Sequence, residues 1–171
     1  HLWDHLVQSR DPALPTFGQP VDHPDKVDLN YVRGEGKADW QHVNSLAADA
    51  AGERFLMSVH GFDELWIVDR ATGALAWRWG NPEAWGGGTP ADRELFGQHD
   101  AQWIAAGRPG AGNILVFDNG AGRPDGDFSR VLELTEDKEI VWEYRGDPLE
   151  SFFSRNISGA ERLWSGATLI C

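Results

Sequence analysis

The fold is decided by residues 42–80, HVNSLAADAAGERFLMSVHGFDELWIVDRATGALAWRWG, where short apolar runs alternate with turn residues. The runs HVNSLAAD, RFLMSVHG, ELWIVDR and ALAWRWG have the alternation that is typical of half-buried β-strands. The turns AAGE and ATG contain the glycine that a tight chain reversal favours. Four short strands in about forty residues match the size of one β-propeller blade.

The same order of strands returns further along the chain. The runs QHDAQWIAAG, NILVFDNG, SRVLELTED and EIVWEYRG follow one another, and a further pair begins within SGAERLWSGATLIC. VDRATGALAWRWG and ELTEDKEIVWEYRG share a strand, a turn and a strand that ends near a glycine. We therefore predict an all-β chain with propeller blades at 41–80 and 98–146, an inter-blade insert at 81–97 and the truncated start of a next blade at 147–171.

Residues 1–40 are rich in proline, glycine and aspartate, so we expect the tail of a preceding blade followed by a long irregular loop. Two blades and part of a third cannot close a ring of about 4–8 blades. Because each blade buries its faces against two neighbours, the terminal sheets would be uncovered. We therefore expect the chain to be a fragment of a β-propeller. Meandering hairpins of a β-sandwich are the alternative explanation.

Composition limits the partners of the chain. Of its 171 residues, 41% are hydrophobic and 25% are charged, as in a folded globular protein. The formal net charge of -12 argues against nucleic acid or a membrane surface as partner, because both require a basic face. No run approaches the roughly 18 apolar residues of a membrane-spanning helix. The one cysteine, Cys171, allows no internal disulfide and no thiolate metal site.

The candidate functional residues begin the innermost strands. In a propeller these strands line the central channel, so polar residues at their starts converge near the axis. His42 opens the first inner strand and His99 opens the next, while the third copy offers Asn156 and Ser158 at the matching place. A single histidine is usually a structural residue. Repetition of a polar residue at the same place favours a functional site.

Three further polar residues follow strands. His60 comes after the second strand of the first blade, and Asn119 comes after the second strand of the next. The Asn119-Gly120 pair is explained equally well as turn chemistry, since both residues tolerate positive φ. Arg123 follows in the loop AGRPDG. A guanidinium near two histidines would bind sulfate, phosphate or carboxylate oxygens through its planar fork.

Other chemistry finds little support in the sequence. GGGT at 86–89 lacks the lysine of a phosphate-binding loop, and there is no Gly-x-Ser-x-Gly motif. The acidic residues lack EF-hand spacing, and no zinc-ligand set is recognisable. We therefore predict neither a metal site nor a cofactor.

The motifs DWQHVNS, ELWIVDRATG, WRWGNP, FGQHDAQW, NILVFDNG and VWEYRG, in this order, resemble the arylsulfate sulfotransferase family of β-propellers. The resemblance covers nearly the whole chain and implies a six-bladed propeller in the full-length protein. It also implies transfer of a sulfuryl group from a phenolic sulfate donor to a phenol acceptor through a histidine intermediate. A periplasmic or secreted location and a homodimer are further implications.

The resemblance assigns roles to particular residues. His42 and His99 match active-site histidines around the channel, and Arg123 matches the arginine that binds the sulfuryl group. Asn44, His60 and Asn119 are expected to bind substrate. The family's nucleophile lies in a later segment, and the corresponding FFSRNISGA contains no histidine. The nucleophile therefore lies beyond Cys171 or has been replaced in this branch.

Two other functions stay open at this point. One is a non-catalytic propeller that binds a ligand or a partner protein through its channel face, since a fold does not fix a function. The other is a quinone-cofactor oxidoreductase on a similar repeat scaffold. That class requires a calcium site, for which the sequence offers no convincing acidic set.

Overall fold

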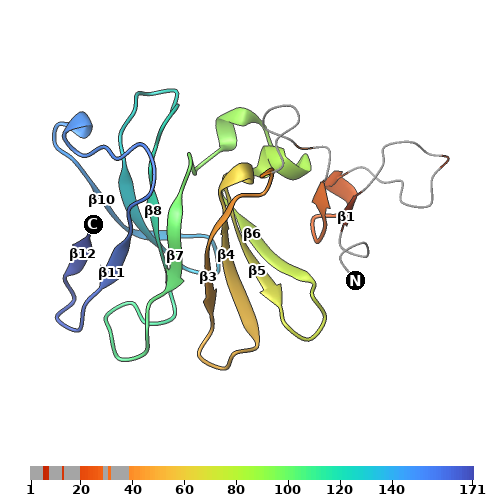
Figure 1. Cartoon of the computed structure of the whole chain (residues 1–171), viewed down its shortest axis with the longest axis horizontal. Helices are drawn as coiled ribbons and strands as arrows, with labels where there is room; N and C mark the ends of the chain where they lie inside the picture. The colour runs from red at the N-terminus through yellow and green to blue at the C-terminus, as the bar shows by residue number, and fades with distance from the viewer. Residues whose placement is uncertain (1–5, 8–12, 14–19, 29–30, 32–38) are drawn as a thin grey trace.

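The computed structural model describes residues 6–7, 13, 20–28, 31 and 39–171. Two four-stranded antiparallel sheets follow one another along the chain, and a two-stranded sheet follows them (Figure 1). The first has the order β3-β4-β5-β6 and consists of β3 (Val43–Ala48), β4 (Arg54–Val59), β5 (Glu64–Asp69) and β6 (Leu75–Trp79). The second has the order β10-β9-β8-β7 and consists of β7 (His99–Trp103), β8 (Ile114–Asp118), β9 (Arg130–Leu134) and β10 (Ile140–Arg145).

The remaining elements are short. The antiparallel pair β11 (Ala160–Arg162) and β12 (Thr168–Ile170) forms the last sheet, and β1 (Leu6–Val7) pairs in parallel with β2 (Val27–Asp28). The described residues also contain short 3-10 helices, which are η2 (Pro20–Asp22), η3 (His60–Phe62), η4 (Pro82–Trp85), η5 (Pro90–Asp92) and η6 (Leu149–Ser151). The part of the chain that the structure describes contains no α-helix, so the predicted all-β class is confirmed.

The strands lie where the alternating apolar runs predict them, and β8 shows why. All five of its residues are buried. Ile114 and Val116 belong to the core between the two large sheets, whereas Leu115 and Phe117 belong to the core on the opposite face. Because successive side chains of a strand point to opposite faces, a strand covered on both sides must be apolar throughout.

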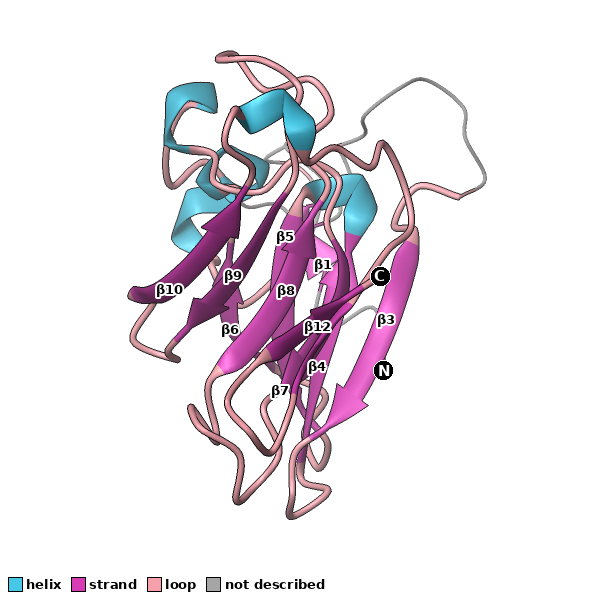
Figure 2. Ribbon diagram, turned by 90° about the vertical axis from the view of Figure 1, so that its left-hand side faces the viewer, coloured by secondary structure: helices cyan, strands magenta, loops and turns pink. Residues whose placement is uncertain are grey.

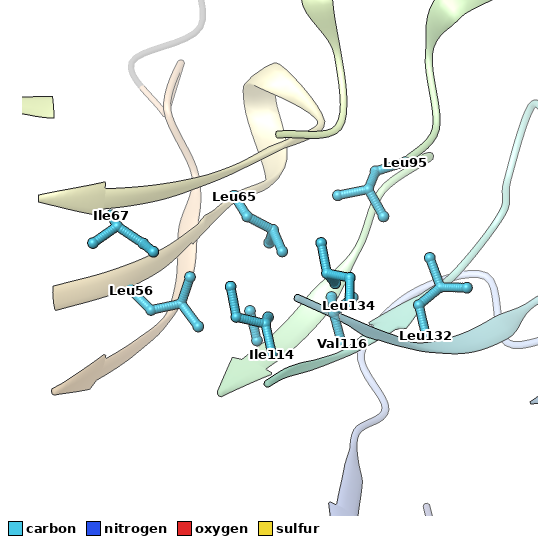
Figure 3. Packing of buried hydrophobic residues seen from close by; sticks show 9 residues of the cluster. Leu56, Leu65, Ile67, Leu95, Ile114, Val116, Leu132 and Leu134 are labelled. Carbon is cyan, nitrogen blue, oxygen red and sulfur yellow. The ribbon is translucent and has the colours of Figure 1, made fainter. Parts of the chain in front are cut away.

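The core between the two large sheets holds them face to face. Leu56, Leu65 and Ile67 come from the first sheet and pack against side chains of the second (Figure 3). The residues contributed by the second half are Leu95, Ala101, Ile114, Val116, Leu132 and Leu134. Stacking of one sheet on the next is the packing expected between neighbouring propeller blades.

Hydrogen bonds join the first strands of successive sheets. Ser45 Oγ on β3 accepts a bond of 2.9 Å from the amide of Ala101 on β7. The carboxylate of Asp100 on β7 accepts one of 3.0 Å from the amide of Ala160 on β11. The strands β3, β7 and β11 therefore form a row along the molecule (Figure 1). Helical turns gather at one end of the strands, and η3 is one of them (Figure 2).

Short elements also lie outside the large sheets. The predicted insert at 81–97 contains η4 and η5. The predicted blade tail and loop at 1–40 lie mostly outside the described residues; the pairing of β1 with β2 is a local structure that the sequence did not predict. Among the described residues, no helix has the length and apolar character needed to cross a membrane.

Candidate active site

Three histidines from two sheets meet at one end of the strands. His42 precedes β3, His60 follows β4, and His99 begins β7. The ring centroids of His42 and His60 are 4.9 Å apart, and those of His60 and His99 are 5.4 Å apart. The structure therefore brings these three predicted site residues into one row, with His60 in the middle.

Local backbone bonds fix the first two histidines. The amide of His60 donates to the carbonyl of His42 over 3.1 Å, and the amide of Gly61 donates to the carbonyl of Gln41 over 2.9 Å. A side chain at residue 61 would collide with the carbonyls of Trp40 and Gln41, so only glycine permits this close approach. The turn after β4 is thereby held against the segment that enters β3.

His42 is oriented by a carboxylate. Its Nδ1 lies 2.5 Å from Oδ2 of Asp39, three residues earlier. Both side chains are exposed, at 47% and 69%. The carboxylate can only accept, so Nδ1 carries the hydrogen and Nε2 is the other ring atom available for chemistry. His42 also has a φ of +46°, a conformation that residues other than glycine seldom adopt.

His99 is oriented by two uncharged acceptors. Its Nδ1 lies 2.7 Å from Oδ1 of Asn119 and 3.0 Å from the carbonyl of Gly97. The Nδ2 group of Asn119 donates to the carbonyls of Ser154 at 2.9 Å and Ile157 at 2.7 Å, which fixes the orientation of the amide. Nδ1 of His99 must therefore carry the hydrogen, and in the neutral ring Nε2 holds the lone pair.

Asn119 and Asn44 make internal hydrogen bonds. The Asn119 side chain is fully buried, and its amide is bonded to His99 and to the segment before β11. These bonds hold the ring of His99 and the segment before β11, and direct substrate binding by Asn119 stays a prediction. Asn44 Nδ2 donates to the carbonyl of Gln98 over 2.8 Å. Its Oδ1 is buried, with no hydrogen-bond partner among the described residues.

The structure does not bring Arg123 into the row of histidines. Its guanidinium forms an ion pair with Asp118 and lies over the rings of Phe96 at 4.8 Å and Phe128 at 4.9 Å. Arg130 shares the same carboxylate at 3.0 Å. Because the charge of Arg123 is paired and its side chain is only 6% exposed, the expected binding of sulfuryl oxygens has no support in this geometry.

A cavity of about 360 Å³ adjoins the middle histidine. It is lined by His60, Asp63, Gly97, Ala121, Arg155 and Asn156. Asn156 was a candidate from the sequence, but Arg155 was not. The sequence could have pointed to Arg155, because it directly precedes Asn156. Asn156 was matched to His42 and His99 in the other copies.

Asp100 is the titratable neighbour of His99 on β7. Burial raises the pKa of the Asp100 carboxyl, and its hydrogen bonds to the Ala160 amide and the Gln102 side chain oppose this effect. Asp100 thus serves chiefly to join β7 to β11. Among the described residues, no group of three or more His, Cys, Asp or Glu side chains could hold a metal ion.

Comparison with known proteins gives one family. A search of curated proteins found no match to the chain. The family model described as Arylsulfotransferase (ASST) matches residues 2–171. This family is a β-propeller, in agreement with the stacked four-stranded sheets, and its substrates are aryl sulfates and phenols. The chain therefore belongs to the arylsulfotransferase family.

Proposed function

We propose that the protein transfers a sulfuryl group from a phenolic sulfate ester to a phenol, with His99 as the nucleophile. The observation that supports this most is the pair of uncharged acceptors at Nδ1 of His99, which leaves the lone pair on Nε2. A neutral imidazole nitrogen is a competent nucleophile when its other nitrogen is held by hydrogen bonds. The nucleophile then lies within the chain.

The reaction divides into two displacements at sulfur. In the first, the Nε2 lone pair of His99 attacks sulfur, the bond from sulfur to the aryl oxygen breaks, and its electron pair leaves on the phenolate. In the second, the oxygen of the acceptor phenol attacks sulfur and the nitrogen–sulfur bond breaks, so that its electron pair returns to the imidazole. The proton of the acceptor must be removed, and the leaving phenolate must be protonated.

The two other histidines suit these proton transfers. His60 lies next to His99, with 5.4 Å between ring centroids, and His42 lies next to His60. A histidine oriented through Nδ1 by a carboxylate, as His42 is by Asp39, is a common arrangement for holding and passing a proton. We assign His60 the proton exchange with the phenols, and His42 the exchange of that proton with His60.

The test is turnover of 4-nitrophenyl sulfate with phenol as acceptor by the full-length protein. We expect nitrophenolate release that requires phenol and is abolished in His99→Ala, while His23→Ala serves as the matched histidine control and retains activity. Rapid quenching should also trap a sulfuryl group on a peptide that contains His99. Unchanged turnover in His99→Ala would remove the assigned role. Tight binding of a phenolic sulfate without any turnover would favour the non-catalytic propeller.

A further inference from the structure

The segment that precedes β11 is held in place on both sides of Arg155. The amide of Ser154 donates to Ser129 Oγ over 2.8 Å, and its carbonyl accepts from Asn119. The carbonyl of Ile157 accepts a second bond from the same asparagine, and Ser158 Oγ donates to Ser154 Oγ over 2.8 Å. The backbone that carries Arg155 is therefore held by side chains from the connection between β8 and β9 and from its own segment.

Ile157 and Ser158 have φ values of +55° and +84°. Two consecutive non-glycine residues in this region are strained, and such strain persists only where the surrounding bonds hold it. The strain and the bonds together define one conformation for residues 154–158. Arg155 is thus presented by a preorganised segment, although its side chain is exposed.

The charge of Arg155 is not neutralised within the described part of the chain. Arg93 and Arg123, which both lie over the ring of Phe96, are paired with carboxylates. Arg155, in contrast, lines the cavity beside His60 and has no ion pair or hydrogen bond to a described residue. The Asp63 carboxylate in the same cavity accepts from the amide of Gly97 over 2.8 Å and lies 3.5 Å from Arg93.

We propose that Arg155 binds the sulfuryl oxygens of the donor in this cavity, in place of Arg123. The inference rests on the proposed function and names the anion-binding residue of that site. A guanidinium presents several donors in one plane and so suits a tetrahedral oxyanion. Asn119 holds both the ring of His99 and the backbone around Arg155. It therefore fixes the position of the proposed nucleophile relative to the anion-binding segment.

Direct binding of inorganic sulfate to the full-length protein tests the site without any turnover. Titration calorimetry should show sulfate binding that is weakened about 10- to 100-fold in Arg155→Ala, as expected for lost charge-assisted hydrogen bonds. Arg155→Lys should recover part of the affinity, because the charge remains but the fork is lost. Arg145→Ala, at another exposed arginine, is the matched control and should bind sulfate as the unmodified protein does.

Kinetics with 4-nitrophenyl sulfate and phenol provide the second arm. In Arg155→Ala we expect the KM for the sulfate donor to rise by about 10- to 100-fold and the KM for phenol to stay unchanged. Sulfate affinity and donor KM equal to those of Arg145→Ala would overturn the proposal, even if His99→Ala abolishes turnover. Arginine-dependent sulfate binding in a protein without turnover would support the anion site and contradict the proposed function.

Discussion

Three buried or partly buried asparagines offer a graded test of how hydrogen bonds hold the site together. Asn44 makes one side-chain hydrogen bond, to the carbonyl of Gln98. Asn81 makes two, with the hydroxyl of Tyr31 and the carbonyl of Phe62. Asn119 makes three, with His99, Ser154 and Ile157. Replacement of each by alanine is the same chemical change in three bonding environments.

The expected cost rises with the number of bonds lost. A net contribution of about 1 kcal/mol per hydrogen bond gives losses in the free energy of unfolding of about 1, 2 and 3 kcal/mol for Asn44→Ala, Asn81→Ala and Asn119→Ala. Some partners keep other bonds after the change at Asn119, because Gly97 still accepts from His99 and Ser129 Oγ still donates to Ser154 over 3.3 Å. The loss of about 3 kcal/mol for Asn119→Ala is therefore an upper estimate, because it treats the three bonds as independent.

Urea denaturation of the full-length protein and its three variants measures these losses, with an unchanged denaturant slope as the sign that compactness is preserved. The order Asn44, Asn81, Asn119 is the prediction. If Asn119→Ala were no more destabilising than Asn44→Ala, the junction between β8 and the segment before β11 would not be held as described. The assignment of Asn119 as the shared anchor of His99 and Arg155 would then fail.

Leu56→Ala should lower the free energy of unfolding by about 2–5 kcal/mol in the same urea assay, since the side chain is fully buried between the two large sheets. Glu136→Gln should cost less than about 1 kcal/mol and less still in high salt, because its bidentate ion pair with Arg54 is between side chains that are 40% and 37% exposed; thermal unfolding at two ionic strengths checks this. Asp100→Asn tests pH dependence. Burial raises the pKa of Asp100 in the folded protein, so its contribution to stability is present at low pH and is lost as the pH rises through that pKa. Between about pH 3 and pH 7, the free energy of unfolding should therefore depend less on pH in Asp100→Asn than in the unmodified protein. Identical pH profiles would contradict a raised pKa of Asp100 in the folded protein.

The fold was largely predictable because its signal is local. β8 is the clearest case, because its run of apolar residues is buried along its whole length. The edge strand β10 is mostly exposed, yet the pattern IVWEYR still predicts it, because aromatic and β-branched residues favour extended backbone. The pairing of β1 with β2 was missed, since two residues on each side give no periodicity.

The site was predictable only in part, because the sequence does not show which charged side chains form ion pairs in the folded protein. The place of a histidine at a strand start is visible in the sequence, and the rings of His42, His60 and His99 do meet. The sequence does not show whether an arginine forms an ion pair with a carboxylate. Arg123 is paired with Asp118 and enclosed by two aromatic rings, whereas Arg155 depends on bonds from Asn119, more than thirty residues earlier.

Backbone strain connects these observations. His42 and Asp100 have positive φ near the starts of β3 and β7, and both strands shift register against their neighbours within the next few residues. Each such residue costs on the order of 1 kcal/mol or more, so the surrounding contacts must hold it. The bonds from Ser45 to Ala101 and from Asp100 to Ala160 do so by joining each first strand to the next. The stacking of the sheets therefore helps to set the spacing of the histidines, as the proposed two-step transfer between fixed groups would require.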